Sequence, residues 1–211
     1  MQISDRITNA NDLFGRSKYV YQNQQYESGF IFDYWACGPS SKDSNGEKFD
    51  GAYPAGFLKR FRYAFKSIFD NNPSILHVCA GRIPKTEGMT LDLNPKYNPD
   101  FLMNAENFHL NQGMEKYHNY FDIVLSDSPY NEEASKKYYG VHLLNKRKML
   151  LGMIACTKVG GIIGVLDQSM PTQIGLKNIK TVAKVAVSSV PNKDLRIFSV
   201  YQKIFTSEKY L

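Results

Sequence analysis

The chain has 211 residues, 43% of them hydrophobic and 22% charged, which suits one α/β domain, or one domain with a modest extension. No segment is long and apolar enough to span a membrane, and residues 1–16 contain no stretch typical of a signal peptide. The net charge of +6 is compatible with a nucleic-acid partner, and equally with none. Composition therefore argues against a membrane partner and leaves other partners open.

The three cysteines, Cys37, Cys79 and Cys156, lie far apart and form no CxxC or Cys/His cluster. Neither a disulfide framework nor a zinc site is therefore expected, and we predict no bound metal. A reducing, cytoplasmic location follows as the expectation. Cys79 and Cys156 lie among apolar residues and are typical of small core side chains.

The first quarter of the chain differs from the rest. Residues 1–30 are polar, and residues 37–51 are rich in Gly, Ser, Asp and Asn, as loops are. We therefore divide the chain into an N-terminal arm and loop (1–50), packed on a domain formed by residues 51–211.

An aromatic group, Asp33–Trp35 with Tyr53 and Pro54, precedes the regular part of the domain. These residues either cover a ligand pocket or fill the core, and we favour the core for Trp35. The next segment, residues 55–71, has apolar residues at helical spacing and basic residues mostly elsewhere on the wheel. It predicts one amphipathic helix that ends near Pro73.

Five apolar runs then alternate with loops and one helix, and each run predicts a buried strand. The runs are SILHVCAG (74–81), GMTLDLNP (88–95), PDFLMNAEN (99–107), FDIVLSDSPY (121–130) and GGIIGVLDQ (160–168), with a helix predicted over 143–159. Two further strand-like runs, 180–190 and 195–205, are separated by Pro191–Asp194 and predict a hairpin. The pattern predicts an α/β fold: a mostly parallel, seven-stranded sheet with a C-terminal antiparallel hairpin and helices on both faces.

Ligands of such sheets bind at the carboxyl ends of the strands. Gly81, Asp92, Asp127 and Asp167 mark four of these ends. The residues Asp127-Ser128-Pro129-Tyr130 combine groups that could bind and activate an amine. An exocyclic amine of a base is a poor nucleophile, and a carboxylate with a nearby carbonyl can accept its N–H groups and aim its lone pair. The ring of Tyr130 can stack on the flat base.

FDIVLSDSPY resembles the catalytic motif of amino-methyltransferases of the class I, Rossmann-like family, which includes N6-adenine and N4-cytosine DNA methyltransferases. The resemblance covers roughly residues 50–205, and GAYPAGFLKRF is similar to the corresponding segment of small, often phage-borne members. It implies S-adenosylmethionine as cofactor and a bacterial or phage-infected host cell. It also implies that Asp127, Ser128, Pro129 and Tyr130 form the catalytic turn.

The resemblance also assigns the cofactor site. It implies that the cofactor is bound by Cys79, Ala80, Gly81, Asp92, Leu93, Asn104, Ala105 and Glu106. Asp92 would accept hydrogen bonds from the ribose, and Asn104 or Glu106 would meet the adenine.

The chain departs from the family pattern at several points. Ser128 replaces the usual proline, and Asn104 stands where aspartate is common. The first glycine loop carries only Gly81 and Gly88. About nine residues link the first two strands, too few for the usual crossover helix.

A basic segment follows the motif, with Lys136, Lys137, Lys146 and Arg147 as candidate nucleic-acid contacts. A solvated helix face is nearly as good an explanation for each of them. We expect a methyltransferase acting on an exocyclic amino group of a nucleic-acid base, DNA adenine N6 before cytosine N4. RNA bases, a protein glutamine, and a non-catalytic subunit of the same fold are the alternatives. The chain looks too short for a large target-recognition domain. Sequence selection is therefore expected to be slight, or to come from the N-terminal arm, from residues 131–148 or from a second subunit, and a homodimer or a partner subunit is a further expectation.

Overall fold

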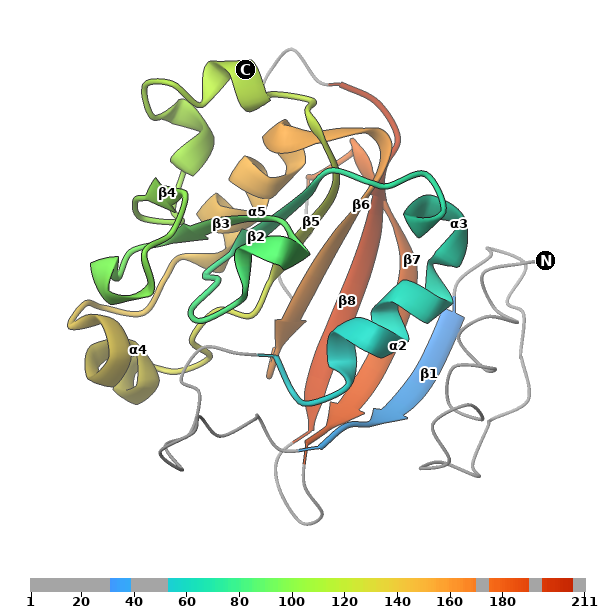
Figure 1. Ribbon diagram of the computed structural model, residues 1–211, viewed down its shortest axis with the longest axis horizontal. Coiled ribbons are helices and arrows are strands. Elements are labelled where there is room, and N and C mark those ends of the chain that lie inside the picture. The colour runs from blue at the N-terminus through green and yellow to red at the C-terminus, as the bar shows by residue number, and fades with distance from the viewer. Residues whose placement is uncertain (1–30, 39–52, 170–174, 190–194, 207–211) are drawn as a thin grey trace.

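The computed structural model describes residues 31–38, 53–169, 175–189 and 195–206. Within these ranges, eight strands form one sheet in the order β1-β7-β8-β6-β5-β2-β3-β4 (Figure 1). The strands are β1 (Ile31–Ala36), β2 (Ile75–Val78), β3 (Met89–Asp92), β4 (Phe101–Leu102), β5 (Phe121–Ser126), β6 (Thr157–Asp167), β7 (Ile179–Ser188) and β8 (Arg196–Lys203). The helices are α2 (Phe57–Ala64), α3 (Lys66–Phe69), α4 (Glu132–Tyr139) and α5 (Lys146–Cys156).

Every pair of neighbouring strands is parallel except the two pairs made by β8, which is antiparallel to both β6 and β7. An antiparallel strand inserted near one end of an otherwise parallel sheet is the arrangement of the Rossmann-like methyltransferase fold. The predicted fold class and the C-terminal hairpin are therefore confirmed. The predicted turn of that hairpin, Pro191–Asp194, lies outside the described residues.

The predicted number of strands, seven, was wrong. The sheet has eight, because Ile31–Ala36 pairs with β7 along its whole length. This segment belongs to the predicted arm, of which residues 1–30 and 39–50 lie outside the described ranges. The sequence did not predict this strand, because the carboxylate of Asp33 interrupts the apolar pattern. In the structure its oxygens accept hydrogen bonds from Tyr34 N (2.7 Å) and Trp35 Nε1 (3.2 Å).

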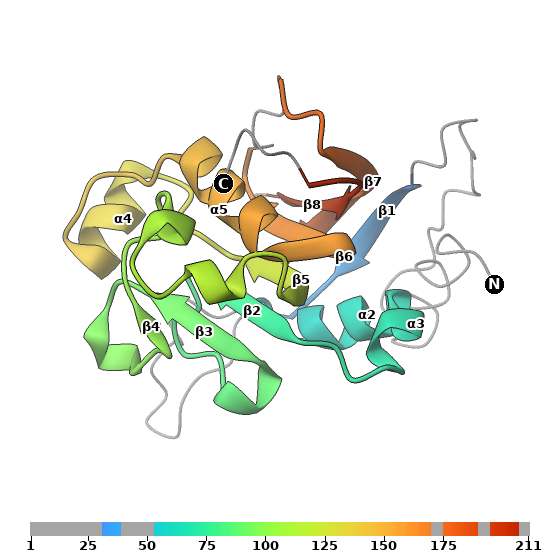
Figure 2. The ribbon, with the colours of Figure 1, turned by 90° about the horizontal axis from the view of Figure 1, so that it is seen from above.

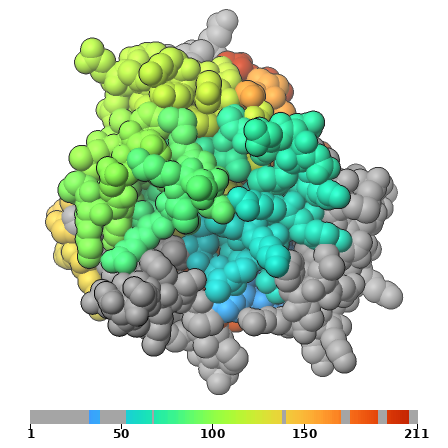
Figure 3. All heavy atoms as spheres, in the orientation of Figure 1, coloured from blue at the N-terminus to red at the C-terminus, as the bar shows by residue number. Residues whose placement is uncertain are grey.

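Helices cover both faces of the sheet (Figure 2). On one face, Phe57 and Phe61 of α2 pack on Trp35 and Phe198, and Trp35 is fully buried, as expected of a core residue. On the other face, α5 contributes Met149 and Met153 to a second core. Figure 3 shows α2, α3 and residues following β2 forming the surface over the first face, so that little of the sheet is visible from that side.

The predicted single helix over residues 55–71 is two helices. Phe65 separates α2 from α3 with φ −109° and ψ 30°, outside helical geometry. Its side chain is nevertheless buried, with its ring centroid 4.8 Å from that of Phe61. The apolar pattern continues across the break because the core, and not the helix, requires it.

The link between β2 and β3 contains only a 3₁₀ turn (Lys85–Glu87), which confirms the predicted absence of a crossover helix. Gly88 makes this short return possible. Its φ is +146°, and a Cβ there would lie 2.8 Å from the carbonyl oxygen of Ile75. A larger residue at this point would push β3 away from β2.

In the described ranges, no helix combines the length and the hydropathy needed to cross a lipid bilayer.

We predict that Trp35→Ala lowers the free energy of unfolding by about 3–5 kcal/mol, because it leaves a cavity between β1, α2 and β8. Urea denaturation followed by circular dichroism measures the change. Trp35→Phe, which keeps a ring in the core, is the matched control and should cost much less. Equal stability of wild type and Trp35→Ala would mean that β1 is not part of the cooperative fold.

Candidate functional site

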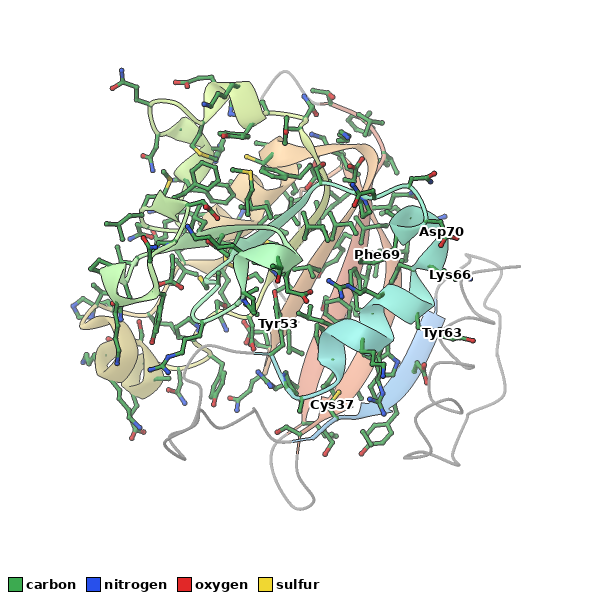
Figure 4. The ribbon with its side chains drawn as sticks, viewed as in Figure 1. Cys37, Tyr53, Tyr63, Lys66, Phe69 and Asp70 are labelled. Atoms are coloured by element: carbon green, nitrogen blue, oxygen red, sulfur yellow. The ribbon has the colours of Figure 1, made fainter. Side chains whose placement is uncertain are left out.

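Several polar side chains meet at the edge of the sheet where the parallel strands end. Asp92 ends β3, Asp127 follows β5, Asp167 ends β6, and Arg196 begins the antiparallel strand β8. Figure 4 labels Tyr53 and Cys37 toward this end of the molecule. This is the edge at which α/β sheets bind ligands.

A pocket of about 240 Å³ opens at this edge, over the ends of β2, β3 and β4. Six of the eight predicted cofactor residues line it; Ala80 and Gly81 do not. The lining residues are Cys79, Leu91, Asp92, Leu93, Asn104, Ala105, Glu106, Pro129, Ser135, Val141, His142, Leu143 and Leu144. The structure thus brings together three segments that the sequence placed at separate strand ends, and adds one wall that was not predicted as cofactor-binding, residues 141–144.

Asp92 organises the floor of this pocket. It is 1% exposed, and its two oxygens accept hydrogen bonds from Gly81 N (2.7 Å) and Asn94 N (2.8 Å). A carboxylate has about four acceptor positions, so a ligand can still donate to it. Asp92 therefore connects the loop after β2 to the end of β3 and also lines the pocket.

The loop after β2 has a strained backbone. Cys79 has φ +56°, in the left-handed region that a side chain disfavours, and Gly81 has φ +54°. Ala80 N donates to Leu91 O at 3.1 Å, which ties the loop to β3. Burial, followed by the charges of Asp92 and Asp127, raises the pKa of the Cys79 thiol, so this cysteine stays protonated. Such strain costs about 1–3 kcal/mol per residue and is typical of functional loops.

The segment after β4 is fixed by its own side chains. Asn104 Oδ1 accepts a hydrogen bond from Glu106 N (2.8 Å). Glu106 in turn accepts from Asn145 N (2.7 Å) and forms an ion pair with Lys148 (3.3 Å). Glu106 therefore holds the start of α5 against the pocket, while Asn104 keeps its amide group for other contacts.

Residues 141–144 form a wall of the pocket and depend on Glu132 at the start of α4. The Glu132 carboxylate accepts hydrogen bonds from Leu143 N (2.8 Å) and lies 2.8 Å from His142 Nδ1. The hydrogen bond from Leu143 N, and to a smaller extent the contact with His142, lowers the pKa of Glu132. Ser135 Oγ donates to the His142 carbonyl (2.9 Å), which closes the turn.

The Asp127–Tyr130 turn leaves β5 directly beside this pocket. Pro129 lines the pocket, and Tyr130 is 39% exposed, as a stacking platform must be. Ser128 is 1% exposed, and its Oγ has no hydrogen-bond partner among the described residues. The turn thus presents one exposed ring next to a buried carboxylate.

The Asp127 carboxylate has a partner that the sequence did not indicate. Arg196 Nη1 lies 2.9 Å from Oδ1 and 3.1 Å from Oδ2, and the side chains are only 14% and 9% exposed. Burial raises the pKa of Asp127 and the charge of Asp167 adds to this, whereas Arg196 opposes both; the resulting pKa is about 6. The two residues are 69 positions apart, so no local pattern could have paired them.

Asp167, which the sequence placed at a strand end, is also buried at this edge. Lys146 Nζ donates to its Oδ1 at 2.6 Å. The side chain of Lys146 is only 16% exposed. The ammonium group predicted to contact phosphate is therefore used to balance a buried carboxylate.

The other basic candidates lie on α4 and at the start of α5. Lys136 is exposed and pairs with Glu132 at 3.5 Å. Lys137 is exposed on α4, and Arg147 is half-buried on α5. Their roles toward nucleic acid stay predictions.

Tyr53 lies near Asp127 and Cys79 and packs on Phe57, with ring centroids 5.1 Å apart. Its hydroxyl oxygen is 3.4 Å from Nδ1 of the buried His77. Burial, then Asp127 and Cys79, raises the pKa of Tyr53, while burial lowers the pKa of His77 to about 4. Both groups are thus neutral near pH 7. Among the described residues, no cluster of His, Cys, Asp and Glu side chains is arranged to hold a metal ion.

No protein-family model matches the sequence, and no curated protein matches it. The chain is similar to the 1,6-didemethyltoxoflavin-N1-methyltransferase of Burkholderia thailandensis, with 11% identity and a TM-score of 0.43 over 73% of this chain and 92% of that chain. It is also similar to TrmN from Thermus thermophilus, with 10% identity and a TM-score of 0.44 over 97% of this chain and 80% of that chain. The similarity to dihydrofolate reductase from Enterococcus faecalis has 14% identity and a TM-score of 0.29, over 83% of this chain and 97% of that chain. These distant similarities include both methyltransferases and a reductase. The fold class therefore rests on the strand order of the sheet.

We predict that Glu132→Ala speeds amide hydrogen exchange severalfold at residues 141–144, because their turn loses its acceptor. Hydrogen exchange followed by mass spectrometry measures this. Glu133→Ala removes the same charge from the neighbouring, exposed position and should leave residues 141–144 unchanged. Equal exchange in both variants would show that Glu132 does not hold this wall.

Proposed function

We propose that the protein is an S-adenosylmethionine-dependent methyltransferase that acts on an exocyclic amino group. The observation that carries the proposal is the position of the Asp127–Tyr130 turn. It borders the pocket that six of the predicted cofactor residues line, and Pro129 belongs to both. A methyl donor in the pocket and an amine held by the turn would therefore be neighbours.

The residues of the pocket fit this cofactor. Asp92 offers a buried carboxylate for the two hydroxyls of a ribose, the usual solution at the end of a second parallel strand. Leu93, Ala105, Val141 and Leu143 offer apolar contacts for a flat adenine, and the amide of Asn104 offers polar ones. When bound, the cofactor supplies an electrophilic methyl group on a sulfonium ion.

The turn supplies the remaining chemistry. Arg196 occupies one side of each Asp127 oxygen, and a carboxylate keeps further lone pairs for the N–H groups of a target amine. The backbone carbonyl of Ser128 is the second acceptor in this hypothesis. Together they would draw the amine toward tetrahedral geometry and direct its lone pair at the methyl group, with no covalent enzyme intermediate. The new N–C bond would form as the S–C bond of the sulfonium breaks, S-adenosylhomocysteine would be the leaving group, and the amine would lose its surplus proton to solvent.

For the target we propose a nucleic-acid base, DNA adenine N6 before cytosine N4. The exposed ring of Tyr130 can stack on a base turned out of a duplex, and the chain carries a net charge of +6. RNA bases and a glutamine side chain share the same amino chemistry and are the alternatives within enzymes. A subunit that keeps the fold without activity is the alternative outside them.

Asp127→Asn should lower methyl transfer by about 100-fold or more, because it removes the charged acceptor aimed at the amine. The assay follows labelled methyl groups from S-adenosylmethionine into DNA and, in parallel, RNA, and identifies the product by nucleoside mass spectrometry. Asp70→Asn, on the exposed end of α3, is the control and should keep wild-type activity. Full activity of Asp127→Asn would refute the catalytic assignment. A wild-type protein that transfers nothing to either polymer would move the target to a protein or the chain to a non-catalytic role.

Asp92→Asn should raise the dissociation constant of S-adenosylhomocysteine about 10- to 100-fold, because hydrogen bonds to a charged group contribute about 1.5–3 kcal/mol. Isothermal titration calorimetry measures it. Asp100→Asn is a matched control, since Asp100 also accepts a backbone N–H, from Thr90 at 2.9 Å, but lies outside the pocket. Similar affinities for the two variants would argue against a ribose contact at Asp92.

A further inference from the structure

Arg196 reaches its carboxylate partner across a strand. β6 lies between β8 and β5 in the sheet, and Arg196 extends over the carboxyl end of β6 to Asp127. The end of β6 at this point is Asp167, which is paired in the ladder with Ile197. Each of the two carboxylates at this edge therefore has its own cation: Arg196 pairs with Asp127, and Lys146 pairs with Asp167.

The contact geometry leaves part of both partners available. A single nitrogen, Nη1, serves both oxygens of Asp127, and no other group among the described residues donates to that carboxylate. The side chain of Arg196 makes no other hydrogen bond within the described ranges. This contact holds the carboxylate through both oxygens while leaving lone pairs on the side away from the guanidinium.

We propose that Arg196 is a positioning residue for the methyl transfer: it keeps the buried Asp127 carboxylate negatively charged and turned toward the target amine. The inference rests on the proposed function and adds to it a residue outside the catalytic turn. A protonated Asp127 would lose the charge that accepts the amine and would no longer aim its lone pair.

An arginine suits this task better than a lysine. A guanidinium keeps its charge when buried, whereas a buried ammonium loses its proton more readily. The groups around Asp127 make a permanent charge useful. Tyr53 and Cys79 are neutral neighbours, and the negative charge of Asp167 raises the pKa of Asp127.

The sign of the effect follows from these contacts. Burial and Asp167 favour the protonated form of Asp127, and Arg196 is the group that opposes them. The pKa of Asp127 is about 6 with Arg196 present, so activity should fall as the pH drops through about 6. Without Arg196 the pKa of Asp127 should rise, and the fall should begin at higher pH.

The test compares wild type with Arg196→Gln and Arg196→Lys in pH profiles of kcat. Arg196→Gln should lose about tenfold or more at pH 7, recover part of this at higher pH, and show a higher midpoint, since each pKa unit changes the ionised fraction about tenfold. Arg196→Lys should show a smaller shift. Arg62→Gln, on an exposed ion pair of α2 with Glu87, is the control and should keep the wild-type profile.

A second readout does not depend on activity. Carbon-13 NMR of labelled aspartate carboxyl groups, with the Asp127 signal assigned by its loss in Asp127→Asn, measures the midpoint directly in wild type and both Arg196 variants. Circular dichroism and cofactor affinity establish that each variant is folded. If Arg196→Gln does not fold, Arg196→Lys carries the comparison, and it should still raise the midpoint.

The outcomes separate the two proposals. Activity that survives Asp127→Asn refutes the proposed function. Loss in Asp127→Asn together with an unchanged midpoint in the Arg196 variants overturns only the inference about Arg196, and leaves it a structural ion pair. Midpoints that rise in both kinetics and NMR support it.

Discussion

The central position of β5 is the constraint on which the rest of the site depends. β5 pairs with β2 on one side and β6 on the other, and its residues Ile123 and Val124 are fully buried against opposite cores. Because a strand covered on both faces cannot slip by one residue without burying the wrong side chains, its register is fixed. The chain therefore leaves the sheet at one defined point, Asp127, and the pairings of β6 and β8 bring Asp167 and Arg196 to the same place.

The short link after β2 requires a different means of shaping the pocket beside it. Parallel strands are usually joined through a helix, whose N-terminus offers N–H groups to a ligand. Here a 3₁₀ turn takes its place, and the loop is held by Asp92, which accepts the N–H of Gly81, and by the strained backbone at Cys79. A buried carboxylate thus gives this loop the rigidity that a helix gives elsewhere.

The sequence predicted what depends on local patterns. Apolar runs bounded by turn residues gave five strands, the hairpin and α5, and strand ends gave Asp92 and Asp127 their places. It did not predict β1, because Asp33 interrupts the apolar pattern, and its contacts, which include those with Tyr34 and Trp35, form only in the folded chain. Nor did it predict Arg196 or the pairing of Lys146 with Asp167. Those contacts join side chains distant in the chain, and only the assembled sheet determines them.

The same non-local contacts reduce the positive charge that is available near the site to bind phosphate. Lys136, Lys146 and Lys148 lie near the site, but each has a carboxylate partner: Glu132, Asp167 and Glu106. A cation that already neutralises a carboxylate, particularly the largely buried Lys146, contributes less to binding phosphate than its count in the sequence implies. The proposal of a nucleic-acid target therefore depends less on these lysines than on the turn itself. An amine acceptor such as Asp127 would serve a base or a glutamine alike, since both present an N–H group. The exposed ring of Tyr130 distinguishes them, because a base offers a broad π-face on which an aromatic side chain stacks and a glutamine amide does not.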